Sequence, residues 1–222
     1  MGVVSLAVRT ALLFSFGALA VQAGELTVRV TDADGKAVAD AVVTVRPQEA
    51  TPPAKVAARK PETRTIDQKD ETFVPYVEIF RPGDQVLFRN SDKVTHHVYS
   101  FSPPKSFEFP IGPDETKPTL TLDKTGVAVI GCNIHDHMIA YLYVSDAPWM
   151  AKSGKDGVVT VNGLGVGNYI VQLWHPQMYP SHPEFEERVS LESADTAKSV
   201  AFSKIPLLPD PRANAGPERG SY

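Results

Sequence analysis

The sequence predicts an all-β protein, and two observations lead to this class. Short runs of alternating apolar and polar residues recur along the chain, and turn residues such as Gly, Pro, Asn and Asp separate them. No segment shows the 3.6-residue periodicity of a convincing amphipathic helix. The 222 residues, of which 42% are hydrophobic, suit one ordinary globular domain or two small ones.

The N-terminus has the pattern of an export signal. Arg9 provides a positive charge, residues 11–21 are apolar, and small residues precede Ala23. We therefore predict a signal peptide at residues 1–23, with cleavage after Ala20 as an alternative. The apolar stretch is about half of the roughly 20 residues that span a bilayer, so we expect a periplasmic or secreted protein that is not membrane-spanning.

The first strands of the mature chain are expected at residues 26–31 and 41–45, where apolar and polar residues alternate. Asp34-Gly35 between them is a hairpin signal, so these strands are predicted to form a two-stranded unit. This two-stranded unit defines the first predicted segment of the mature chain, residues 24–46. Residues 47–62 are rich in Pro, Ala, Lys and Glu, which indicates an exposed linker and a domain boundary.

A second series of strands follows, in a domain predicted at residues 63–146. Its strands are expected at residues 73–79, 85–89, 95–99, 119–122, 127–130 and 139–144, with a proline-rich stretch at 103–118. After a linker-like stretch at about 146–155, the segment 147–205 contains two more predicted strands, at 157–161 and 168–174, around a glycine-rich turn. Residues 206–222 are proline-rich and polar without periodicity, so a disordered tail is expected.

The only cysteine of the chain, Cys132, lies in a short segment that also contains His135 and Met138. Exported proteins usually pair their cysteines, so a single one requires another explanation. A thiolate, an imidazole and a thioether are three of the four donors of a mononuclear electron-transfer copper site, and the fourth is a second histidine. The predicted strand at 95–99 supplies that histidine. The alternative is an inert buried thiol.

Two pairs of adjacent candidates need a choice. His96 and His97 fall on opposite faces of a strand, so only one of them can point toward Cys132, and we assign His96 to the site. In the loop, His137 could coordinate copper in place of Met138, which would favour Cu(II) and lower the potential. That second choice stays open.

Other functions find little support. The formal net charge is −4 and no basic stripe appears, so nucleic acid is not an expected partner. One cysteine excludes a binuclear copper centre that needs two, and the thiol-protease, serine-hydrolase, phosphate-loop and zinc-hydrolase patterns are missing. We therefore expect an electron carrier and no enzyme. His175 and His182, with Met178 between them, are interpreted as part of a packed loop and not as a second copper site.

Residues 63–144 resemble the cupredoxins, in particular plastocyanin and amicyanin. The residues that carry this resemblance are Gly83-Asp84-x-Val86-x-Phe88-x-Asn90, His96-x-Val98, Gly126 and Cys132-x-x-His135-x-x-Met138. The last spacing is similar to that of amicyanin. The resemblance implies a Greek-key cupredoxin β-sandwich with one mononuclear type 1 (blue) copper at one end, held by His96, Cys132, His135 and Met138.

The same resemblance implies how the site would work. Electrons would leave through His135 near the surface, with Ile134 and Ile139 in an apolar docking patch, and the partner would be a periplasmic dehydrogenase or a cytochrome. This sequence departs from the family at two positions that support the ligand loop: position 97 is His where a bracing Asn is common, and position 134 is Ile where a stiffening Pro is common. Passages around His96 and Cys132 also resemble secreted bacterial proteins described as methylamine utilization proteins.

A second resemblance concerns the flanking segments. Residues 30–45 and 157–174 resemble the two halves of a carboxypeptidase regulatory-like (transthyretin-like) β-sandwich, which implies that the cupredoxin domain is inserted into a second small β-sandwich. Alternatively, residues 24–46 are extra strands of the cupredoxin. Two other functions remain open: a periplasmic copper carrier or chaperone with the same ligands, and a metal-free β-sandwich interaction module.

Overall fold

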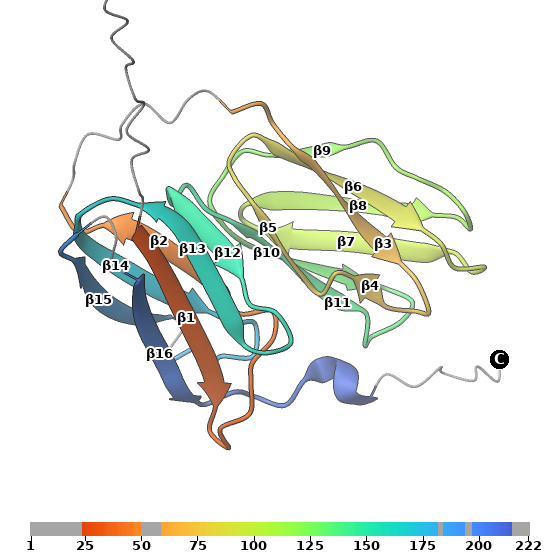
Figure 1. Cartoon of the computed structure of the whole chain (residues 1–222). Coiled ribbons are helices and arrows are strands. Elements are labelled where there is room, and N and C mark those ends of the chain that lie inside the picture. The colour runs from red at the N-terminus through yellow and green to blue at the C-terminus, as the bar shows by residue number, and fades with distance from the viewer. Residues whose placement is uncertain (1–23, 50–58, 182–183, 194–196, 215–222) are drawn as a thin grey trace, which may run out of the picture.

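The computed structural model describes residues 24–49, 59–181, 184–193 and 197–214 (Figure 1). In these ranges every regular element is a β-strand apart from one short 3-10 helix, η1 (Pro211–Asn214), so the predicted all-β class is confirmed. None of the described residues forms a helix long and apolar enough to cross a membrane. The predicted signal peptide at 1–23 lies outside the described residues.

Strands from both ends of the chain build one sandwich, which we name the terminal sandwich. Its two sheets have the strand orders β13-β1-β16 and β12-β2-β14-β15. The strands are β1 (Gly24–Asp32), β2 (Val42–Pro47), β12 (Trp149–Lys152), β13 (Val158–Leu164), β14 (Gly167–Trp174), β15 (Phe185–Leu191) and β16 (Ala197–Ile205). Valines that alternate along β1 and β2 meet leucines of β13 and β14 in a common core.

The chain does turn back at Asp34-Gly35, where Thr31 forms an antiparallel bridge with Ala37, but the predicted pairing of residues 26–31 with 41–45 is wrong, because β1 and β2 belong to different sheets. Asp32 Oδ1 accepts the N–H groups of Asp34 and Lys36, at 3.0 and 2.8 Å, which closes a local turn after β1. Asp40 then adopts a positive φ of 60° before the chain enters the facing sheet. The two strands therefore face each other across the core instead of pairing.

The middle of the chain forms the central sandwich. Its sheets have the strand orders β5-β11-β10-β7-β8 and β4-β3-β6-β9 (Figure 1). The strands are β3 (Thr63–Gln68), β4 (Phe73–Val74), β5 (Val77–Phe80), β6 (Asp84–Asn90), β7 (His96–Ser102), β8 (Lys105–Ile111), β9 (Leu120–Leu122), β10 (Gly126–Cys132) and β11 (Ile139–Val144). Its core includes Phe73, Phe88, Ile130 and Leu142, all essentially buried.

Two strands lie where the sequence predicted a proline-rich stretch and a linker. Strand β8 falls within 103–118 and pairs in register with β7, from His96 opposite Ile111 to Ser102 opposite Lys105. It is an edge strand, so Pro110 can occupy an exposed position without removing a hydrogen bond from the sheet interior. Strand β12 falls within 146–155 and pairs with β2 at the edge of the other sandwich.

The two sandwiches contact each other through an aromatic cluster. The ring of Trp174 lies 5.1 Å from that of Tyr143 and 5.9 Å from that of Tyr141, as centroid distances. Val42 of β2 is buried in the same cluster. Arg81 of the central sandwich donates hydrogen bonds to two carbonyl oxygens in the segment 147–148, at 2.7 and 3.0 Å. The contact is therefore both apolar and hydrogen-bonded.

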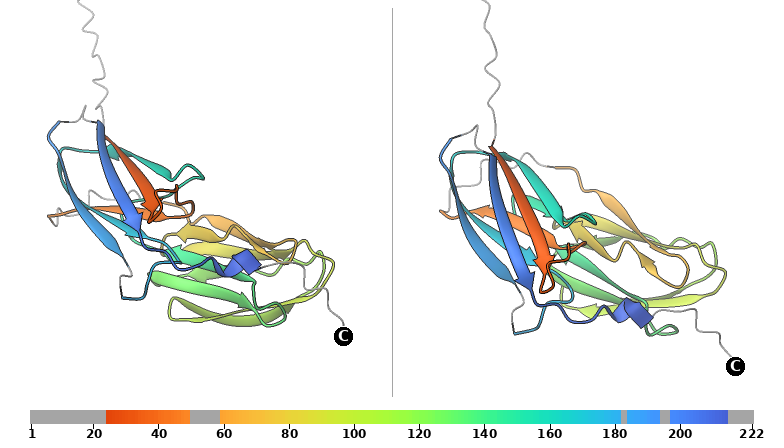
Figure 2. Two further views of the ribbon diagram at one scale, coloured as in Figure 1. Left: turned by 90° about the horizontal axis from the view of Figure 1, so that it is seen from below. Right: turned by 60° about the horizontal axis from the view of Figure 1, so that its bottom comes forward.

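The expectation of a disordered tail at 206–222 is wrong for residues 206–214. This segment leaves β16 and runs past the terminal sandwich to the central one (Figure 2). Leu207 packs against the terminal core, and the N–H of Leu208 donates to the carbonyl of Gln177 at 2.7 Å. The composition of this segment suggested that it had little surface to bury. In the structure, Leu207 packs on the terminal core, and the guanidinium of Arg212 packs on the ring of Tyr76. Residues 215–222 lie outside the described residues.

Candidate metal centre

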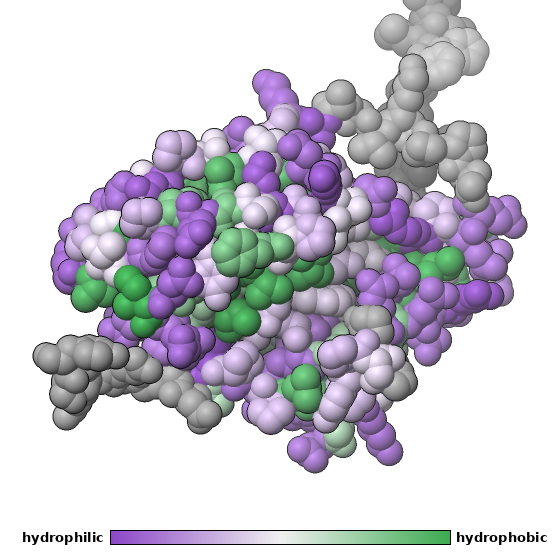
Figure 3. Space-filling model, turned by 180° about the vertical axis from the view of Figure 1, so that it is seen from behind, coloured by the Kyte–Doolittle hydropathy of each residue, from purple (hydrophilic) through white to green (hydrophobic). Residues whose placement is uncertain are grey.

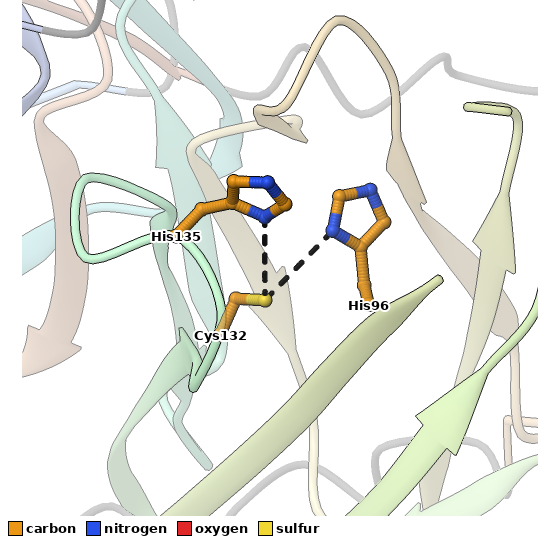
Figure 4. Close-up of side chains that lie close together, drawn as sticks. All are labelled: His96, Cys132 and His135. Carbon is orange, nitrogen blue, oxygen red and sulfur yellow. Dashed lines mark hydrogen bonds between the residues drawn. The ribbon is translucent and has the colours of Figure 1, made fainter. Parts of the chain in front are cut away.

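Three predicted ligands meet at one end of the central sandwich. His96 is the first residue of β7, Cys132 is the last residue of β10, and His135 lies in the turn that follows (Figure 4). Cys132 pairs with Val98 across the sheet, which brings the ends of β7 and β10 together. The two histidines lie on opposite faces, as alternation predicts, and it is His96 that is fully buried, whereas His97 is partly exposed.

The geometry is that of a small donor cluster. The Sγ atom of Cys132 lies 3.8 Å from Nδ1 of His96 and 3.9 Å from Nδ1 of His135. One donor atom from each of the three residues lies within 4.8 Å of the others, and no other such group of three His, Cys, Asp or Glu residues occurs in the described part of the chain. The two imidazole centroids are 5.0 Å apart.

Met138 and His137 lie in different surroundings. Met138 is buried, its N–H donates to the carbonyl of His135 at 3.0 Å, and it lines a groove of about 320 Å³ together with Cys132. His137 is turned toward another segment, because its Nε2 lies 3.1 Å from the carbonyl oxygen of Glu71. Its ring centroid is 6.1 Å from that of His135.

The electrostatics favour a thiolate. Burial raises the pKa of Cys132, but hydrogen bonds from His96, from neighbouring backbone groups and from His135 outweigh it and lower that pKa to about 6. Burial also acts on His96, where it lowers the pKa, yet the hydrogen bonds to Cys132 and Asp92 raise that pKa above its ordinary value. The thiolate is the form of cysteine that binds metals.

The ligand loop has a brace that the sequence interpretation missed. The N–H of Asn133 donates to the carbonyl of His97 at 3.0 Å. Its side-chain amide lies 3.3 Å from Oε1 of Glu108 and 3.4 Å from Nδ1 of His97. The loop therefore supplies the amide that position 97 lacks, and the asparagine directly after Cys132 was the available signal.

A second missed residue is Asp92, in the segment between β6 and β7. Its Oδ2 atom lies 2.9 Å from Nε2 of His96, on the side of the ring away from Cys132. The spacing of four residues between the acid and the histidine was visible in the sequence. That spacing alone did not show that the carboxylate of Asp92 would point toward the ring of His96.

The remaining predicted residues are placed as follows. Ile134 is 52% exposed, and Ile139 is partly buried beside the groove. His175 is buried in the terminal sandwich, and its backbone N–H donates to Sδ of Met178 at 2.9 Å. His182 lies outside the described residues.

The donor set fits copper. A thiolate and two imidazoles are the donors that a mononuclear electron-transfer copper uses, and the buried Met138 lines the same groove as the cysteine. Two of the three donors are buried and the third is half-buried, so the cluster lies beneath the surface at one end of the sheet.

Comparison with protein-family models and with curated proteins found no match. Among solved structures, part of the chain is similar to cupredoxins. A copper-containing nitrite reductase from Thermus scotoductus SA-01 is 24% identical over 37% of this chain, with a TM-score of 0.35, and the chain spans 22% of that protein. Amicyanin from Paracoccus versutus is 14% identical over 46% of this chain and 98% of its own length, with a TM-score of 0.34. A purple cupredoxin from Nitrosopumilus maritimus is 19% identical over 38% and 99%, with a TM-score of 0.33.

Proposed function

We propose that this protein is an electron carrier with one mononuclear type 1 copper held by His96, Cys132, His135 and Met138. The observation that carries the proposal is the convergence of Cys132 Sγ with the Nδ1 atoms of two histidines. The copper, when bound, supplies a one-electron couple between Cu(II) and Cu(I). The polypeptide would hold the donors in place and tune the potential.

Held donors are an advantage for electron transfer, because ligands that stay in place need little rearrangement. His96 and Cys132 belong to paired strands, and Asn133 ties the loop after Cys132 to β7 and β8. A filled set of four ligands leaves no open position for a substrate, which favours a carrier over a catalytic copper.

Met138 is the preferred fourth ligand. It is buried and lines one groove with Cys132, whereas His137 faces the carbonyl oxygen of Glu71. His137 would have to give up that contact to bind the metal. A thioether is a weak and soft axial donor, which matches an electron-transfer site better than a third imidazole does.

The partner would dock near the loop at 133–139. Ile134 is largely exposed there, and electron-transfer contacts are typically small and transient. Figure 3 shows apolar side chains gathered on the outer face of the five-stranded sheet, where Phe101 and Val129 are exposed beside the same groove. A periplasmic dehydrogenase or a cytochrome is the proposed partner, and the predicted signal peptide supports a periplasmic location.

In this proposal the terminal sandwich is a scaffold that carries the central, copper-binding sandwich. Strands β1 and β2 pair with strands that follow residue 147, which supports an insertion of the copper domain between two halves of a carboxypeptidase regulatory-like sandwich. The link to methylamine utilization rests on the sequence resemblance.

A copper carrier or chaperone is the second candidate. The observation that favours it is the additional imidazole of His137, whose centroid is 6.1 Å from that of His135 and which could accept the metal during transfer. An electron carrier should retain copper in the presence of a chelator over many turnovers. A copper carrier or chaperone should release the copper to the chelator rapidly.

The visible absorption spectrum of the copper-loaded protein tests the proposal. An intense thiolate-to-copper band is expected in the wild type and in His137→Gln, a changed spectrum in Met138→Leu, and no such band in Cys132→Ser. Copper that binds without this band, or equally well after loss of Cys132, would contradict the electron-transfer site.

A further inference from the structure

We propose that Asp92 is a positioning residue that fixes the ring of His96 and joins it to the turn at residues 69–72. The position of the ring is a property of the protein alone, whereas its effect on the metal rests on the proposed function. The carboxylate is 12% exposed and makes three contacts: 2.9 Å to Nε2 of His96, 2.6 Å to the N–H of Asp70 and 3.0 Å to the N–H of Glu71.

The turn that Asp92 binds is unfavourable on its own. Lys69 and Thr72 exchange backbone hydrogen bonds at 2.9 and 3.2 Å, so Asp70 and Glu71 form a two-residue hairpin loop between β3 and β4. Both residues have a positive φ, of 54° and 52°. This pattern favours Asn-Gly or Asp-Gly, and a glutamate in the left-handed region is costly. The Asp92 carboxylate offsets that cost by accepting both N–H groups of the loop.

The same turn contacts the ligand loop. The carbonyl oxygen of Glu71 lies 3.1 Å from Nε2 of His137, next to Met138. The turn therefore lies between the segment that carries His96 and the loop that carries the other donors. Asp92 is the side chain that connects it to the first of these.

The contact between Asp92 and His96 determines which ring nitrogen carries the hydrogen and which is left for the donor cluster. An ionised carboxylate accepts hydrogen bonds but cannot donate them, so Nε2 of His96 must carry the hydrogen of this bond. Nδ1, 3.8 Å from Cys132 Sγ, is then the nitrogen that faces the thiolate. Acidic partners of this kind orient metal-binding histidines and increase their basicity.

A structural role alone is the competing explanation, since Asp92 also stabilises a strained turn. Asp84 provides a matched control at the opposite end of β6. It is buried and accepts the N–H groups of Glu62 and Arg81, both at 2.9 Å, so it also combines two backbone donors with one charged side chain. Its replacement should weaken the fold without affecting the metal site.

The first measurement is nitrogen NMR of His96 in the metal-free protein. We expect a proton on Nε2 in the wild type and in Asp84→Asn. A wild-type ring without a proton on Nε2 would overturn the proposal, whether or not any variant folds. This result is independent of copper, so it separates failure of the positioning role from failure of the proposed function.

The second measurement compares copper-loaded Asp92→Asn and Asp84→Asn with the wild type. Asp92→Asn should weaken copper binding by about 10- to 100-fold and raise the reduction potential, because a negative charge that favours Cu(II) is lost. Asp84→Asn should leave both quantities at their wild-type values. Equal potentials and affinities in all three proteins would overturn the role of Asp92 at the metal, and a wild type without a thiolate-copper band would instead reject the proposed function.

Discussion

The guanidinium group of Arg212 lies over the ring of Tyr76, with its central carbon 3.3 Å from the ring centroid. Tyr76 directly precedes β5 in the central sandwich, whereas Arg212 belongs to the segment that follows β16 of the terminal sandwich. The guanidinium also donates two hydrogen bonds to the carboxylate of Asp210, at 3.0 and 2.7 Å. The C-terminal segment therefore fastens the two sandwiches together beside their aromatic contact.

Replacement of Arg212 by alanine should weaken this attachment. A cation over an aromatic ring contributes about 0.5 to 2 kcal/mol, and the partly buried position of Arg212 suggests about 1 kcal/mol. Unfolding in urea, followed by tryptophan fluorescence, measures the loss because Trp174 lies in the contact. Arg188→Ala is the control, since that side chain is 69% exposed and makes only a 3.8 Å ion pair. Equal effects of the two substitutions would contradict the fastening role.

Replacing Ser153 by alanine removes fewer atoms than Arg212→Ala but should lower the free energy of unfolding by more. The buried hydroxyl of Ser153 accepts the N–H of Ala41 at 2.9 Å and donates to the carbonyl of Val38 at 2.8 Å. Ser153→Ala would leave both backbone groups buried without this partner, which costs about 1 to 3 kcal/mol of unfolding free energy. Chemical denaturation measures it, with the exposed Ser190→Ala as control. A loss no greater than that of the control would contradict this assignment.

The sequence predicted the parts of the structure that depend on local pattern. Alternation identified most strands and put His96 and His97 on opposite faces, because successive side chains of a strand point in opposite directions. The motif around Cys132 identified a donor group because its members are close along the chain. Those features need no knowledge of how distant segments meet.

The features that the sequence did not predict depend on pairing between distant segments. A turn at Asp34-Gly35 is compatible with a hairpin or with a crossing to the facing sheet, and only the packing of both strands on a shared core decides between them. Strand β8 was hidden by Pro110, which an edge position tolerates. Asp92 acquires its role only when the turn at 69–72 folds over it.

Gly157 should tolerate no side chain. Its φ is +69°, and a Cβ atom there would lie 2.5 Å from the carbonyl oxygen of Val30 and 3.1 Å from the amide nitrogen of Val38. Gly35 has a φ of +80° but nothing within 4 Å of its Cβ position, so Gly35→Ala measures the cost of the positive φ without a clash. We expect Gly35→Ala to cost about 1 kcal/mol and Gly157→Ala about 3 kcal/mol or more. Thermal unfolding of both variants checks this, and similar midpoints would contradict the clash.

His175 should make the terminal sandwich sensitive to acid. Burial lowers the pKa of this ring to about 4, against weaker opposing effects of Ala39 and Asp40. An unfolded histidine has a pKa of about 6.5, so the unfolded chain binds more protons between those values and stability falls as the pH drops through this window, by up to about 3 kcal/mol. His175→Gln removes the titrating group. The stability difference between wild type and variant, measured by denaturation as a function of pH, should therefore shrink as the pH is lowered, and a constant difference would contradict a neutral buried ring.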